Sequence, residues 1–122
     1  MPNNRPWEPG RYMYAGVAVL SETAAAGEQL SLAIPAPEAD EGIFILGWSG
    51  KFGHTGAAPL LRFQLADGTP IWDEGLPAQD TWGARDFGEV GLPAGADGAA
   101  VDVIASNAEL SVGELFVRYQ TR

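Results

Sequence analysis

Apolar and polar residues alternate along much of the chain with a period of two, which is typical of half-buried β-strands. In the run EQLSLAI, residues 28–34, this alternation places Leu30, Leu32 and Ile34 on one side and polar or small residues on the other. The same kind of pattern predicts a series of short strands and no helix. We expect strands at 11–20, 28–34, 42–48, 60–66 and 69–73, a short strand around 85–90, and two more within 99–120.

The longest alternating stretch is AAVDVIASNAELSVGELFVRYQ, residues 99–120, in which two runs flank a polar connection. We interpret it as a closing β-hairpin centred on Leu110, because one register then satisfies both faces of the ribbon. One face would pair Val101 with Tyr119, Val103 with Val117 and Ala105 with Leu115; the other would pair Asp102 with Arg118, Ile104 with Phe116 and Ser106 with Glu114. An exposed apolar pair of Ile104 and Phe116 predicts an interface with another protein subunit.

The middle of the chain gives more specific expectations. Residues 42–48, GIFILGW, form the most continuous apolar run and predict a central strand that places Trp48 in the core. Asp67-Gly68 lies between alternating runs and predicts a hairpin turn in which both residues tolerate positive φ. Pro70 restricts the returning strand to a sheet edge.

Two segments are predicted to be loops. Residues 21–27, SETAAAG, are too few for a stable helix and end in glycine. The glycine-rich stretch 50–56 holds Lys51, Phe52 and His54, so it is a candidate ligand-binding loop.

Seven or eight short strands at roughly ten-residue spacing predict an all-β, antiparallel two-sheet β-sandwich. A jelly-roll-like topology is the first expectation and an immunoglobulin-like topology is the alternative. At 122 residues without cysteine, the chain is long enough for one core that needs no disulfide. We therefore predict a single sandwich domain over 11–122.

Residues 1–10, MPNNRPWEPG, are predicted to form an extended N-terminal arm. The prolines, which include Pro6 and Pro9, restrict the backbone and exclude a helix or a central strand. Trp7 lies between them. It is either an exposed residue of a frayed terminus or an aromatic anchor that docks on a neighbouring subunit.

The net charge of −9 repels phosphate and anionic lipid, so we expect no nucleic-acid or membrane partner. The start of the chain lacks the apolar region of a secretion signal, and no later run reaches the ~20 apolar residues that span a bilayer. We therefore expect no secreted or membrane-inserted form.

Catalytic and cofactor motifs are missing from the sequence. Thiol catalysis is excluded, and His54 is the one histidine on which a Ser-His-Asp triad would depend. No serine lies in a nucleophile-elbow motif, so a polar loop histidine is the expected role. Four acids lie near aromatic residues and could serve a small hydrolase or hold Ca²⁺, but no calcium-loop motif is present. These acids are Asp73, Glu74, Asp80 and Asp86. We expect no enzyme, no cofactor and no metal.

Four tryptophans are many for this length. Trp72 and Trp82 are the two whose position the pattern leaves open. If exposed, they would be stacking platforms for sugar rings, which makes a carbohydrate-binding module the alternative function.

The proline-rich arm MPNNRPWEPG and a strand series ending in GELFVRYQTR together resemble the small decoration or cement proteins of tailed-phage heads. The resemblance is one of architecture and composition. It implies a structural protein of the virion that forms a homotrimer or another quasi-symmetric cluster, contacts the major shell protein through its arms and stabilises the shell without chemistry.

Overall fold

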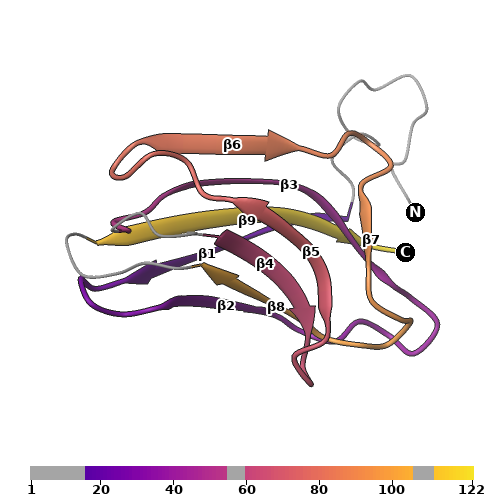
Figure 1. The fold of residues 1–122 in the computed structure, drawn as a ribbon. Helices are drawn as coiled ribbons and strands as arrows, with labels where there is room; N and C mark the ends of the chain where they lie inside the picture. The colour runs from indigo at the N-terminus through magenta and orange to yellow at the C-terminus, as the bar shows by residue number, and fades with distance from the viewer. Residues whose placement is uncertain (1–15, 55–59, 106–111) are drawn as a thin grey trace.

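The computed structural model describes residues 16–54, 60–105 and 112–122 of the chain. These residues form nine β-strands and no helix (Figure 1). The strands are β1 (Val17–Ala24), β2 (Leu30–Ile34), β3 (Ile43–Lys51), β4 (Leu60–Leu65), β5 (Pro70–Gly75), β6 (Trp82–Asp86), β7 (Leu92–Ala94), β8 (Val101–Ala105) and β9 (Gly113–Thr121).

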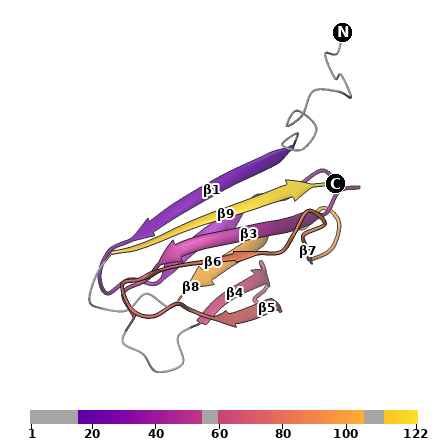
Figure 2. The same ribbon diagram turned by 90° about the horizontal axis from the view of Figure 1, so that it is seen from above.

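The strands form two antiparallel sheets that pack face to face. Sheet A has the order β1-β9-β3-β6, with β7 also paired to β3, and sheet B has the order β2-β8-β4-β5. The all-β, two-sheet antiparallel sandwich is therefore confirmed. The first strand pairs with the last and the second with the one before the last, so the strand order is nested. Figure 2 shows the strands of sheet A side by side, with β1 at one edge.

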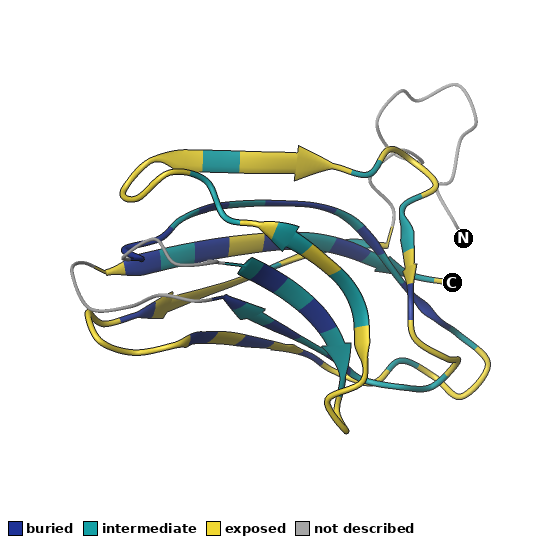
Figure 3. Cartoon of the chain, in the orientation of Figure 1, coloured by how far each residue is buried: buried dark blue, intermediate teal, exposed yellow. Residues whose placement is uncertain are grey.

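The core lies between the two inner faces. Alternate residues of β2, β4, β8 and β9 are buried, as are five of the nine residues of β3, and these appear as the dark bands of Figure 3. Sheet A contributes Ile43, Ile45, Trp48, Leu115, Val117 and Tyr119, and sheet B contributes Leu30, Leu32, Ile34, Leu61, Phe63, Val101, Val103 and Ala105. Trp48 is 3% exposed, so its predicted place in the core is confirmed.

The predicted closing hairpin is wrong. β8 pairs with β2 and β4 in sheet B, whereas β9 pairs with β1 and β3 in sheet A. The alternation does predict the buried side of each strand. Val101, Val103 and Ala105 of β8 are buried, and so are Leu115, Val117 and Tyr119 of β9. In a sandwich, however, two apolar faces can oppose each other across the core as well as lie on one ribbon. Ile104 and Phe116 therefore lie on the outer faces of different sheets, and Asp102 does not face Arg118.

The hairpin that joins β4 and β5 is confirmed, but its turn differs from the predicted one. Of the two central residues predicted for the turn, Asp67 and Gly68, only Gly68 has positive φ, at 90°. Its N–H donates to the carbonyl of Leu65, and the Leu65 N–H donates to the carbonyl of Thr69, both at 2.9 Å. This is a type I turn followed by a glycine bulge. Asp67 stabilises the turn by accepting a 2.9 Å hydrogen bond from the Thr69 N–H.

The central strand β3 contains a bulge that changes which residues face the core. Its register to β9 shifts between Ile45 and Gly47, so Ile45 and Trp48 both point inward although they are three residues apart. Gly47 allows the strand to pass beneath the Arg118 guanidinium. A Cβ there would lie 2.6 Å from the carbonyl oxygen of Arg85, so only glycine fits.

Three boundaries differ from the sequence expectations. The segment 21–27 is not all loop, because β1 continues to Ala24. The segment 50–56 is not an open ligand loop over its described part, because β3 continues to Lys51 and Phe52 is fully buried. The short strand expected at 85–90 is β6, which begins earlier at Trp82. Residues 1–15 lie outside the described residues, so the boundary between arm and domain stays a prediction.

We expect Phe63→Ala to lower the free energy of unfolding by about 3–5 kcal/mol, because Phe63 is fully buried between the sheets and truncation leaves a cavity. The matched control is Phe116→Ala on the outer face, which we expect to cost less than about 1 kcal/mol. Urea unfolding followed by tryptophan fluorescence measures both. Equal costs would contradict the assignment of inner and outer faces.

Candidate functional site

Two exposed aromatic side chains, Trp82 on β6 and Phe116 on β9, meet on the outer face of sheet A. Their ring centroids lie 6.2 Å apart with 31° between the ring planes. The residues are 55% and 40% exposed. β3 runs between their strands and presents the small Ser49 opposite Phe116. We call Trp82 and Phe116 the aromatic pair; it leaves apolar surface open to solvent on the outer face of sheet A.

Charged residues border the aromatic pair. Lys51 on β3 lies opposite Trp82 on one side and Glu114 on the other. Further along the same face, Gly47 has Asp86 and Arg118 as its two cross-strand neighbours. An apolar centre with a charged rim is the usual composition of a protein–protein contact surface.

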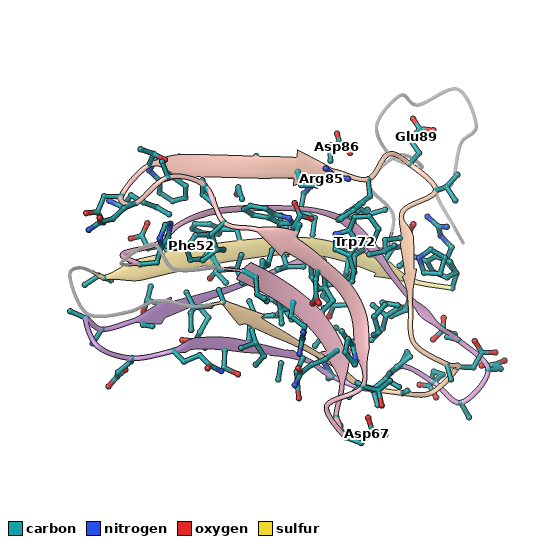
Figure 4. All side chains as sticks on the ribbon, in the orientation of Figure 1. Phe52, Asp67, Trp72, Arg85, Asp86 and Glu89 are labelled. Atoms are coloured by element: carbon teal, nitrogen blue, oxygen red, sulfur yellow. The ribbon has the colours of Figure 1, made fainter. Side chains whose placement is uncertain are left out.

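The second tryptophan of interest, Trp72, lies in a different environment. It lies opposite the core residue Phe63 and packs against the core, and its Nε1–H donates a 2.8 Å hydrogen bond to Glu74. The Arg85 guanidinium lies 5.6 Å from the centre of its ring, and Phe87 meets the ring edge-on at 5.7 Å. Figure 4 shows Arg85 on β6 beside Trp72. We call these four residues, Trp72, Glu74, Arg85 and Phe87, the flank cluster.

The flank cluster closes one side of the sandwich. Phe87 also contacts the core residue Phe63 edge-on, at 6.4 Å, and its N–H donates to the Leu46 carbonyl at the β3 bulge. Arg85 lies 5.4 Å from the Phe87 ring and 3.9 Å from Glu74 Oε2. Cation–π and ionic contacts of this kind contribute about 0.5–2 kcal/mol where they are partly desolvated. Trp72 is therefore engaged with protein groups and is not a free stacking platform.

His54 lies in the loop that follows β3, as the sequence predicts, but its side chain is buried, at 7% exposure. Its Nε2 lies 2.7 Å from the carbonyl oxygen of Pro77, so Nε2–H donates to that oxygen. The Asp80 N–H donates in the same region to the Phe52 carbonyl, at 2.9 Å. Both bonds fasten the connection between β5 and β6 to the end of β3. Pro77 in turn packs over Gly83, where a Cβ would approach it to 2.8 Å.

The four acids considered for chemistry do not form one group. Asp73 faces the outside of sheet B, where it accepts two hydrogen bonds from Arg62 at 2.7 and 3.0 Å. Glu74 belongs to the flank cluster, and Asp86 accepts a hydrogen bond from the Gly88 N–H. Among the described residues, no three histidine or acidic side chains gather as metal ligands would. In the same residues no helix is long and apolar enough to cross a membrane.

The sequence-predicted interface residues are separated or lie outside the description. Ile104 is half-buried on the outer face of sheet B, opposite Ser31 and Arg62, and so lies far in the fold from Phe116. Pro6, Trp7 and Pro9 lie outside the described residues. The sequence predicts Trp82 as a candidate sugar-stacking residue and Phe116 as an interface residue paired with Ile104, but it does not predict that Trp82 and Phe116 lie next to each other. Arg85 was not singled out at all, because its role depends on β5 and β6 lying at the same flank.

Comparison with known proteins finds no protein family whose model matches this chain and no curated protein sequence that matches it. Solved structures that show similarity to this chain include three. The first is from the Bacillus endospore appendages that form disulfide-linked pili, with a TM-score of 0.44, 16% identity and coverage of 85% of this chain and 86% of that chain. The second is from the capsid asymmetric unit of cyanophage Pam1, with a TM-score of 0.37, 18% identity and coverage of 87% of this chain and 86% of that chain. The third is from infectious bursal disease virus strain Gx, with a TM-score of 0.31, 17% identity and coverage of 84% of this chain and 32% of that chain. All come from pili or virus particles. With every TM-score below 0.5, no property of these proteins is carried over.

The Arg62–Asp73 pair makes stability depend on pH. Hydrogen bonds from Arg62 lower the pKa of Asp73, and the Thr69 bonds lower that of Asp67. A lowered carboxyl pKa stabilises the fold above the unfolded-state pKa of about 4, and this contribution is lost as pH falls through the folded-state value. We therefore expect the urea midpoint to fall as the pH drops below about 4 and passes through the lowered pKa values of these two carboxyls. Asp73→Asn and Arg62→Gln should each weaken this fall, whereas Val90→Ala should keep it. An unchanged slope in both charge variants would contradict the role of the pair.

We expect His54→Ala to destabilise the protein by about 1–3 kcal/mol, because the Pro77 carbonyl loses its hydrogen-bond donor. Exchange of the Asp80 amide hydrogen should accelerate, since its bond to Phe52 fastens the same connection. His54→Gln, which retains a donor, is the matched control and should cost less. Amide exchange read by NMR measures the effect. Unchanged exchange at Asp80 in His54→Ala would show that the histidine does not hold this connection.

Proposed function

We propose that this chain is a non-enzymatic structural protein that binds other protein subunits on a virus particle, as a decoration or cement protein of a phage head. The single observation that supports the proposal most is the aromatic pair. Trp82 and Phe116 are large, exposed and mutually oriented, and aromatic residues with a charged rim are enriched where proteins bind one another.

The chemistry of the described residues gives this proposal more support than an enzymatic one. The Nε2–H of His54 donates to a backbone carbonyl. Asp73 accepts a hydrogen bond from Arg62, and Glu74 accepts one from Trp72. The proline-rich sequence of residues 1–10 with its central Trp7 adds a second contact element that suits attachment to a neighbouring subunit. The proposal includes three-fold clustering and contact with the major shell protein, as the resemblance to decoration proteins implies.

A carbohydrate-binding module is the second candidate, and the aromatic pair is also the observation that favours it. Two exposed rings inclined by 31° could stack against successive sugar rings. Trp72 is no longer part of this candidate, because the flank cluster covers it. Titration with glycans should then change tryptophan fluorescence, and Trp82→Phe should remove most of that change.

The proposed function predicts self-association that needs both contact elements. We expect deletion of residues 1–10 to reduce the number of chains per particle, measured by light scattering, to one third of the full-length value. The double variant Trp82→Ser with Phe116→Ser should weaken assembly in the same direction, because it removes the apolar centre of the surface.

The matched control for the double variant is Val90→Ser, which changes an exposed apolar residue away from the aromatic pair and should leave the mass unchanged. A full-length protein whose mass does not respond to deletion of residues 1–10 or to loss of the aromatic pair would contradict the proposal.

A further inference from the structure

The two flanks of the sandwich differ sharply. One flank carries the edge strands β5 and β6, and the other carries the edge strands β1 and β2, which lie one above the other in Figure 1. The flank cluster closes the first flank, and Pro70 is the first residue of its edge strand β5. Natural sheets use charges, prolines and bulges in this way to block pairing with another chain.

The second flank lacks most of these devices. β1, VAVLSETA, has eight residues, no proline, no bulge and Glu22 as its single charged residue. β2, LSLAI, has no charged residue and no proline. In the described part of the chain no strand pairs with the open edge of β1 or of β2. Val19 in the middle of β1 is 59% exposed.

Backbone geometry indicates which β1 groups face this open edge. The Thr23 N–H donates to the side chain of its neighbour Glu22, at 3.2 Å, and therefore points away from β9. In an antiparallel pair the direction of the N–H groups alternates, so Val19 and Ser21 also direct theirs to the open edge. These donors are available to an added strand.

From these observations we infer that β1 pairs with β1 of a second copy of this chain across a two-fold axis. This inference deepens the proposed structural function, on which it rests, by naming one partner and the surface that it uses. With Leu20 opposite Leu20 of the second copy, Val19 would exchange backbone hydrogen bonds with Ser21. The same register places Glu22 opposite Ala18, so the two carboxylates do not face each other.

A second copy suits this edge better than a charged partner strand does. The residues of β1 are self-complementary in antiparallel pairing, and closed two-fold contacts are the commonest form of self-association. An axis perpendicular to sheet A would also bring β2 beside β2 of the second copy, because β2 lies at the same flank in sheet B. Both sheets would then continue across the contact.

Ser21→Pro in the full-length chain tests the inference. Its lost N–H faces the open edge, so the β1–β9 ladder is preserved while a donor to the second copy is removed. The mass from light scattering should be an even multiple of the chain mass in the unchanged protein and should fall to half in Ser21→Pro. Val19→Lys, which places a charge at the contact, should do the same. Val90→Lys is the matched control, because Val90 is exposed in the connection between β6 and β7 and belongs to neither β1 nor β2.

The outcomes separate this inference from the proposed function. An odd multiple of the chain mass in the unchanged protein overturns the β1 pairing, and a three-chain mass would do so while supporting the proposed clustering. A mass that stays constant in both Ser21→Pro and Val19→Lys, with native circular dichroism, also overturns it. Slow exchange of the Val19 and Ser21 amides that becomes fast on dilution supports it. Loss of assembly only on removal of the aromatic pair supports the proposed function and overturns the pairing.

Discussion

Burial of the two inner faces against each other is the interaction on which this structure depends. Each long strand presents one apolar side, and neither sheet can hide that side alone. The packed layer is continuous from Leu30 in sheet B to Leu115 in sheet A, and no disulfide contributes to it because the chain has no cysteine. Surface features are free to vary because this layer fixes the positions of the strands that carry them.

The sequence determined the faces of the strands more reliably than their neighbours. Val103 and Val117 were both predicted to be buried, and both are fully buried. Their strands nevertheless belong to different sheets. A period of two shows which side of a strand is apolar, but it does not show whether the partner is a neighbouring strand of the same sheet, about 5 Å away, or a strand of the facing sheet, about 10 Å away. Sheet order depends on long-range pairing that no local pattern encodes.

The candidate site was predictable in its parts but not in its assembly. Trp82 and Phe116 were each identified from residue type, yet they meet only because β3 separates their strands and presents Ser49 between them. Trp72 and Trp82 could not be distinguished, since their orientation depends on where β5 and β6 begin. The role of His54 was also beyond the sequence, because its partner Pro77 is 23 residues away.

The flank cluster has a consequence for how far any assembly of this protein can extend. A β-sandwich with two open flanks could add subunits at both sides without limit and would grow into a fibre. Here Arg85 and Glu74 place opposite charges beside one pair of edges, and Pro70 withholds a backbone donor there. These features oppose the addition of a strand at β5 and β6, so any growth through the sheets would be confined to the flank of β1 and β2.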